Sequence, residues 1–193
     1  MTIRLLNANP LFDYREACKT TLGINLADGE NGIKPPKNEV EYWIKQIVAN
    51  HSTLRCIRFR IIDAEPKSVV MQIIRATKGH PQPYVQSSRP DWTGKERSKD
   101  PYELKLFAHD HTAESFIEMC KQRLCMRTEE KTRFAVWSIV KEMKKSDIPF
   151  IKAVGICASP ACFWYNGCPE IKNCGLIENK PVAEKFLKLY KYE

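Results

Sequence analysis

The sequence contains no run of apolar residues near the roughly 20 that a membrane-spanning helix requires, and this excludes a transmembrane protein. Its first six residues are too short and too polar a segment to act as a secretory signal. Internal repeats and low-complexity tracts are absent, which excludes a repeat architecture. The sequence also lacks an obvious Cys/His pair for nucleophilic catalysis. We therefore expect a cytoplasmic protein that has no membrane partner.

The sequence does contain an ordinary supply of core-forming residues and an excess of positive charge. Its 193 residues are 43% apolar and 28% charged, enough for one domain, or one domain with an appendage, that buries a core without disulfides. The net charge of +8 favours polyanions or phosphorylated small molecules as partners. Nucleic-acid-binding proteins usually concentrate such charge on one face. Here Lys and Arg are spread along the whole chain, with one modest cluster at 141–145.

Apolar residues recur in patterns that predict a mixture of helices and strands. Asn38 can cap a helix and Glu41 can complete a capping box, and apolar residues at helical spacing follow them. Residues 56–62 alternate between apolar side chains and arginine, which is typical of a strand with one buried face and one basic or wet face. Because strands and helices do not alternate regularly, the predicted class is α+β. The other expected strands are 3–6 and 102–107, the other expected helices are 11–22, 66–75, 112–124, 128–145 and one from Pro181 onward, and the expected loops are 23–37, 79–83 and 90–101.

Two neighbouring stretches are rich in side chains that suit a planar, anionic ligand such as a nucleotide. The first is Met71-Gln72-Ile73-Ile74-Arg75 at the end of an expected helix, and the second is Gln86-Ser87-Ser88-Arg89. Arginine offers a planar fork that matches phosphate oxygens, and Gln and Ser supply directional hydrogen bonds. The alternative interpretation is a solvated loop, since residues of these types are usually exposed.

These stretches resemble the signature of flavin-dependent thymidylate synthases. In that family a Gln precedes an Arg-His-Arg run by three residues and a Ser-x-Arg closes the motif, as Gln72 precedes Arg75 and Ser87-Ser88-Arg89 follows here. The segment 112–124 lies where the family has Asn-Ala-Arg-Ser-Leu ending in Leu-Arg, and Arg133 follows Arg123 at the family's spacing. The resemblance covers roughly residues 1–145, and Arg75-Ala76-Thr77 occupies the place of Arg-His-Arg.

The resemblance implies a fold, a reaction and a set of residue roles. The fold is a mixed one, with an antiparallel sheet packed by long helices over residues 1–150, assembled as a homotetramer. The reaction is reductive methylation of dUMP to dTMP with FAD, NADPH and methylenetetrahydrofolate, or a related one-carbon change such as hydroxymethylation. The implied catalytic residues are Arg89 and Arg123. Substrate binding is implied for these two together with Gln72, Gln86, Ser87 and Ser88, and cofactor binding for His51, Ser52, Arg75, Thr77 and Thr112.

The C-terminal part of the chain, residues 151–193, carries a second candidate site. Cys157, Cys162, Cys168 and Cys174 lie within 18 residues on a segment rich in Pro and Gly. Four thiolates at short spacing can enclose Zn²⁺ tetrahedrally, and an iron–sulfur cluster is a variant of the same idea. The spacing is not the Cys-x2-Cys pattern of zinc knuckles, and the alternative is four isolated buried thiols. We expect this segment to pack on the same domain and its cysteines to hold zinc.

Two other functions remain open at this level. The first is a zinc-stabilised nucleic-acid-binding module, which would use the basic surface and the aromatic residues Phe163-Trp164-Tyr165. The second is a catalytically inactive relative that binds a nucleotide or a partner. The presence or absence of a flavin chromophore, and the salt dependence of any nucleic-acid binding, distinguish these functions from the flavin enzyme.

Overall fold

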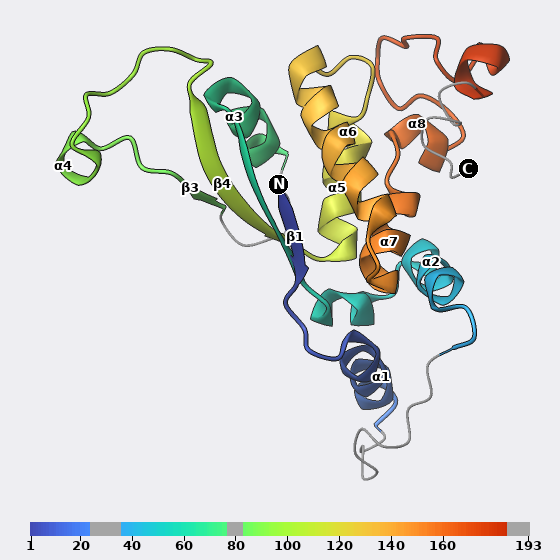
Figure 1. The fold of residues 1–193 in the computed structure, drawn as a ribbon. Helices are drawn as coiled ribbons and strands as arrows, with labels where there is room; N and C mark the ends of the chain where they lie inside the picture. Colours follow the sequence, from blue (N-terminus) through green and yellow to red (C-terminus); the bar gives the residue numbers. More distant parts are fainter. Residues whose placement is uncertain (24–35, 77–82, 185–193) are drawn as a thin grey trace.

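A four-stranded antiparallel sheet with helices against it forms the body of the computed structural model, which describes residues 1–23, 36–76 and 83–184 (Figure 1). The order of the strands is β1-β2-β4-β3, so the two longest strands lie side by side in the middle of the sheet. This arrangement confirms the α+β class. The strands are β1 (Thr2–Leu5), β2 (Phe59–Pro66), β3 (Tyr84–Val85) and β4 (Leu104–His111).

The helices of the described residues include the long ones that the apolar periodicity predicts. Asn38 caps α2 as expected, because its side-chain oxygen accepts a hydrogen bond from the backbone N–H of Glu41 at 3.1 Å. Residues 24–35 of the expected loop and 185–193 of the expected last helix lie outside the described residues. The helices are α1 (Pro10–Thr21), α2 (Glu39–Ala49), the 3-10 helix η2 (Ser52–Cys56), α3 (Lys67–Arg75), α4 (Pro90–Thr93), α5 (Ala113–Arg123), α6 (Glu130–Lys145), α7 (Pro149–Cys157) and α8 (Ala161–Trp164).

The register of β2 and β4 separates apolar and charged side chains onto opposite faces of the sheet. Phe59 and Ile61 of β2 are fully buried and face the helices, as the alternation of residues 56–62 predicts. Arg60 lies on the other face opposite Asp110, and its Nε and Nη2 donate to the carboxylate at 2.5 and 2.8 Å. The strand begins later than expected because residues 52–56 form η2.

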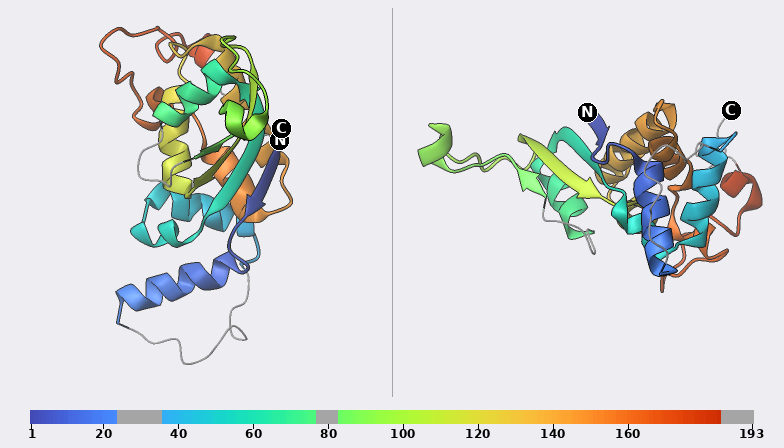
Figure 2. Two further views of the ribbon diagram at one scale, coloured as in Figure 1. Left: turned by 90° about the vertical axis from the view of Figure 1, so that its left-hand side faces the viewer. Right: turned by 90° about the horizontal axis from the view of Figure 1, so that it is seen from below.

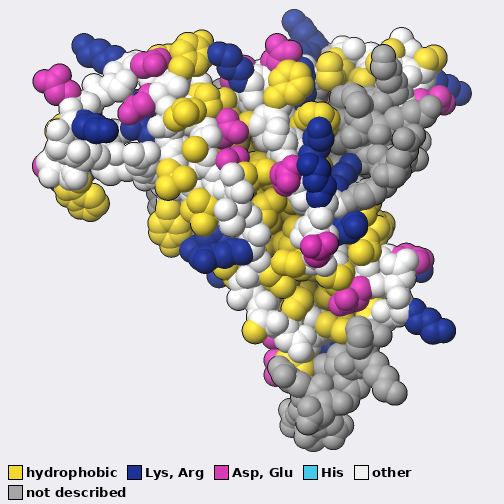
Figure 3. All heavy atoms as spheres, in the orientation of Figure 1, with side chains coloured by type: hydrophobic (Ala, Val, Ile, Leu, Met, Phe, Trp, Pro, Cys, Tyr) yellow, Lys and Arg dark blue, Asp and Glu magenta, His cyan; other side chains and the backbone are white. Residues whose placement is uncertain are grey.

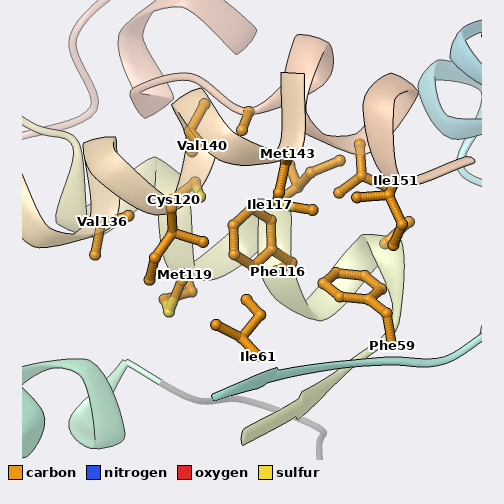
Figure 4. Packing of buried hydrophobic residues seen from close by; sticks show 14 of the residues in the cluster. Phe59, Ile61, Phe116, Ile117, Met119, Cys120, Val136, Val140, Met143 and Ile151 are labelled. Atoms are coloured by element: carbon orange, nitrogen blue, oxygen red, sulfur yellow. The ribbon is translucent and has the colours of Figure 1, made fainter. Parts of the chain in front are cut away.

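The core lies between the sheet and the layer of helices α5, α6 and α7. Figure 4 shows Phe59 and Ile61 of the sheet pointing toward Phe116 and Met119 of α5. On the far side of α7, α2 packs with Trp43 edge-to-face against Phe150, at 5.2 Å between ring centroids. Helix α7 therefore joins the N-terminal and C-terminal parts of the chain in one core, although residue 150 was the expected end of the first region.

Strand β4 differs most from the sequence-based expectation. It runs from Leu104 to His111 rather than ending at Phe107, because two histidines continue the buried face of the strand. His109 and His111 are fully buried and share a hydrogen bond, whereas Asp110 points to the opposite face. The His-Asp-His sequence thus cannot converge on one metal ion, since neighbouring residues of a strand face opposite ways.

Charged side chains are distributed over the surface rather than gathered on one element. In Figure 3 the Lys and Arg side chains are scattered over the visible face, with acidic side chains between them. Among the described residues, no helix has both the length and the apolar character that crossing a bilayer requires.

Candidate functional site at the ends of two helices

Two arginines that the sequence singles out lie near each other at the C-terminal ends of α3 and α5. Arg75 is the last residue of α3 and is exposed, and Arg123 is the last residue of α5 and is half-buried. Burial lowers the pKa of Arg123, and the nearby charge of Arg75 lowers it further. The Nε–H of Arg123 is buried without a hydrogen-bond acceptor. This pair of cations, one with an unused donor, is suited to an anion.

The pattern of buried residues explains where each arginine lies on its helix. Helix α3 buries Val69, Val70 and Ile73, which leaves Gln72 and Arg75, three residues apart, as neighbours at the margin of the buried stripe. On α5 the side chains of Met119 and Cys120 are fully buried, and Arg123 follows them by one turn on the same side. The dipole at each helix C-terminus favours a cation, which offsets part of the repulsion between the two guanidinium groups.

The residues expected to bind substrate from the second stretch lie elsewhere in a single chain. Gln86 extends the pairing of β3, since its N–H donates to the carbonyl oxygen of Leu106 at 2.8 Å. The Oγ of Ser87 accepts a hydrogen bond from the N–H of Arg89 at 3.1 Å, and Ser88 is half-buried between them. These residues lead into α4, which Figures 1 and 2 show projecting from the body and away from α5.

Arg89 is held in place on this projecting segment by its own neighbours. Its Nη2 and Nε donate to the carboxylate of Asp91 at 2.5 and 3.2 Å, and its guanidinium lies over the ring of Trp92 at 5.0 Å. Trp92 is 73% exposed, so the whole group faces outward. The structure therefore brings Arg75 and Arg123 together in one chain but does not bring Arg89 to them.

The other residues expected to bind cofactor lie near the start of α5, at the opposite end from Arg123. Thr112 caps α5, because its Oγ1 accepts a hydrogen bond from the N–H of Ser115 at 3.2 Å. Since α5 has 11 residues, its two ends are about 16 Å apart. His51 is exposed at the start of η2, beside Ser52. Thr77 lies outside the described residues.

The surroundings of Ser52 do not suit the diphosphate of FAD. Ser52 lines an open hollow of about 630 Å³ together with the acidic residues Asp13 and Glu16. Two carboxylates would repel a diphosphate. The Oγ1 of Thr112 already accepts a hydrogen bond from the N–H of Ser115 at the start of α5. Arg55, the nearest basic residue of η2, is paired with Glu114 by two hydrogen bonds of 2.5 and 3.1 Å. The described residues thus fit a phosphate near Arg75 and Arg123 better than a flavin near Ser52.

The cysteines expected to hold metal divide differently from the sequence-based grouping. Cys162, Cys168 and Cys174 line one small cavity, and the fourth thiol there belongs to Cys125, after the end of α5. Burial raises the pKa of Cys162, and the neighbouring thiols of Cys125, Cys168 and Cys174 raise it further.

Cys157 is not among the residues that line this cavity. Burial alone raises its pKa to about 12. The sequence pattern missed Cys125 because 36 residues separate it from Cys162. As the side chains lie, no three His, Cys, Asp or Glu residues of the described ranges are arranged to hold a metal ion.

A comparison with protein-family models finds none that matches this chain, and a search of curated proteins finds no match either.

Proposed function

We propose that the chain binds the phosphate of a pyrimidine nucleotide at Arg75 and Arg123, and that it acts on this nucleotide in the manner of a flavin-dependent thymidylate synthase. The observation that carries the proposal is a pair of guanidinium groups near enough for their charges to interact, one of them with a buried Nε–H that has no acceptor. Gln72, one turn before Arg75 on α3, supplies a further amide for the sugar or base.

The two arginines favour an anion at this position, against the helix dipoles, whose C-terminal ends disfavour one. A buried N–H without a partner costs about 1–3 kcal/mol, and a phosphate oxygen that accepts its hydrogen bond removes this cost. The fork of a guanidinium matches two phosphate oxygens at once, which makes arginine more selective for phosphate than a lysine would be. The pKa of Arg123 is lowered first by burial and then by the charge of Arg75, and a bound phosphate would offset this repulsion.

The proposal includes an assembly of several copies of the chain. The resemblance assigns Gln86, Ser87, Ser88 and Arg89 to the same nucleotide, yet in one chain they lie on the projecting segment before α4. A homotetramer in which this segment reaches a second copy would join the two halves of the site. The exposure of Arg89 and Trp92 to solvent supports this arrangement, although Arg89 would have to leave the carboxylate of Asp91 before it could bind a phosphate.

The expected reaction is conversion of dUMP to dTMP, or hydroxymethylation of the same ring. In the family that the sequence resembles, FAD recharged by NADPH supplies the hydride and methylenetetrahydrofolate supplies the carbon. The described residues near Ser52 and Thr112 do not fit FAD, so the protein's own contribution is limited to holding the phosphate and orienting the ring. Arg123 beside the nucleotide would also favour negative charge that develops on it.

Titration calorimetry with dUMP tests the nucleotide site. Arg123→Ala should remove a charge-assisted interaction worth about 1.5–3 kcal/mol, so that affinity falls about 10- to 100-fold. Arg4→Ala is the matched control. Arg4 is exposed on β1 and pairs with Arg60, so it lies on the open face of the sheet, away from the helices. The control should bind dUMP like the unmodified protein, and deoxyuridine without its phosphate should bind neither form measurably.

Three results would contradict the proposal. Equal dUMP affinity for Arg123→Ala and the unmodified protein would place the phosphate elsewhere. Tighter binding of a single-stranded oligonucleotide than of dUMP, weakened equally by both substitutions, would favour the nucleic-acid-binding function. Nucleotide binding with no flavin absorbance after addition of FAD would leave a binding protein without the redox reaction. Sedimentation measurements on the same samples test the tetramer.

A further inference from the structure

Four cysteine side chains from three separate segments meet at one cavity beside the C-terminal end of α5. Cys125 lies just after α5, Cys162 lies in α8, and Cys168 and Cys174 lie in the turn-rich segment that follows α8. The cavity measures about 20 Å³, room for about one atom the size of a water molecule. All four thiols are free cysteines.

The segment that carries Cys168 and Cys174 has little to hold it in place. Residues 165–175 are mostly exposed, and Ile171, the one large aliphatic side chain among them, is fully exposed. Asn166 and Gly175 lie in the left-handed region of the backbone, so the segment turns sharply at both ends. Its contact with the body includes a hydrogen bond from Arg127, two residues after Cys125, to the carbonyl oxygen of Lys172.

We propose that Cys125, Cys162, Cys168 and Cys174 bind a single Zn²⁺ ion, which fastens the segment 165–175 to the end of α5. Four thiolates are the donor set of structural zinc sites, with tetrahedral geometry and Zn–S bonds of about 2.3 Å. The cavity has the size of one ion and not of a cubane cluster of iron and sulfide. Binding energy from the metal replaces the apolar core that this segment lacks.

The surroundings of the cavity bear on the charge of such a site. A zinc ion with four thiolates carries a net charge of −2, and Lys121, whose side chain is only 12% exposed, lines the cavity from α5. Its Nζ is also 4.9 Å from the ring centroid of Trp164, beside Cys162. The positive charge of Lys121 favours such a site. The negative charge of Glu170, which also lines the cavity, disfavours it, but Glu170 is exposed to water. As the side chains of the described residues lie, they are not arranged around a metal ion, so the proposal requires the four thiols to turn toward one point when zinc binds.

Metal analysis of purified protein, with one serine substitution at a time, tests the proposal. The unmodified chain should contain about one zinc per chain, and no disulfide should form among the four cysteines. Cys125→Ser should lower zinc affinity by more than about tenfold in a chelator competition, since even changes outside the ligand set cost 10–100-fold. Cys157→Ser is the matched control and should retain full zinc content and affinity. Cobalt in place of zinc should give the thiolate charge-transfer bands of a tetrahedral site.

The pair Cys125→Ser and Cys157→Ser separates this proposal from the sequence-based grouping. Loss of zinc in Cys157→Ser with retention in Cys125→Ser would overturn it. Purified protein without metal, protein with iron and sulfide, or protein with two disulfides would also overturn it. Should Cys125→Ser fail to fold, X-ray absorption of Cys157→Ser still decides, because four sulfur neighbours around zinc in a protein without Cys157 are incompatible with the sequence-based grouping, and fewer than four would overturn the proposal. These outcomes are independent of nucleotide binding.

Discussion

Gly155 lies where α7 approaches α6 so closely that no side chain fits between them. A Cβ atom added at this position would lie 2.8 Å from the Cβ of Met143, 3.0 Å from the backbone nitrogen of Lys144 and 3.1 Å from the carbonyl carbon of Met143. Carbon atoms in good contact are about 3.5–4.0 Å apart. Because these neighbours are a Cβ and backbone atoms, they cannot turn aside. Gly155→Ala should therefore force the two helices apart.

The expected size of the effect follows from two opposing terms. Overpacking a core with one extra carbon costs about 1–3 kcal/mol, and contact with backbone favours the upper end of this range. Replacing Gly by Ala in the middle of a helix stabilises the protein by about 1 kcal/mol, because Ala has the higher helix propensity. The net loss is about 2 kcal/mol, which corresponds to a fall in Tm of about 4–8 °C for a chain of this size.

Thermal unfolding followed by circular dichroism measures this loss. Gly167→Ala is the control, since an added Cβ there would meet its nearest atom, the carbonyl oxygen of Tyr165, at 3.9 Å. The control should change stability by no more than about 0.5 kcal/mol. A Tm for Gly155→Ala equal to or above that of the unmodified protein would refute the reasoning. It would mean that α6 and α7 can separate without cost.

Two further substitutions test the sheet and the start of α5. Asp110→Asn should lower stability at pH 7 and flatten its acid dependence. The hydrogen bonds from Arg60 hold the pKa of Asp110 below its usual value, so this stabilisation is present above the unfolded pKa of about 3.9 and is lost as pH falls through the folded pKa. Urea unfolding at several pH values measures this pH-dependent stability, and the exposed Asp147→Asn is the control. An acid dependence of Asp110→Asn equal to that of the unmodified protein would contradict the role given to Asp110. Thr112→Ala should cost about 1 kcal/mol through loss of the helix cap, and Thr112→Ser should not; equal Tm values for the two variants would assign Thr112 another role.

Local patterns predicted those elements whose residues carry a strong period. The apolar stripe of α2 and the alternation of β2 are examples, since each expresses its buried face directly in sequence. The end of β4 was not predictable in this way, because the buried residues there are histidines. Helix α7 is not among the expected elements, although Pro149 begins it at the first turn, where a proline is tolerated.

The candidate site shows the same division between local and long-range information. Arg75 and Arg123 are both identified from sequence, but in different roles, and only the fold reveals that their charges interact. Arg89 follows Arg75 closely in sequence but lies at the start of α4, on the projecting segment. Spacing likewise grouped Cys157 with three cysteines that it does not join, while Cys125 arrives from a distant helix end. Spacing along the chain is a poor guide to which of these side chains come together, because the paths of the loops between the helices determine it.

The packing of α2 on α7 has a consequence for the order in which the protein folds. Trp43 and Phe150, in contact through their rings, are separated by about a hundred residues, and closing such a loop costs roughly 4 kcal/mol of chain entropy before the contact forms. During synthesis at about 5–20 residues per second, α2 would have to wait roughly 5–20 s for its partner. Its apolar stripe stays uncovered for that time, so the nascent chain should be a substrate for chaperones until α7 has left the ribosome.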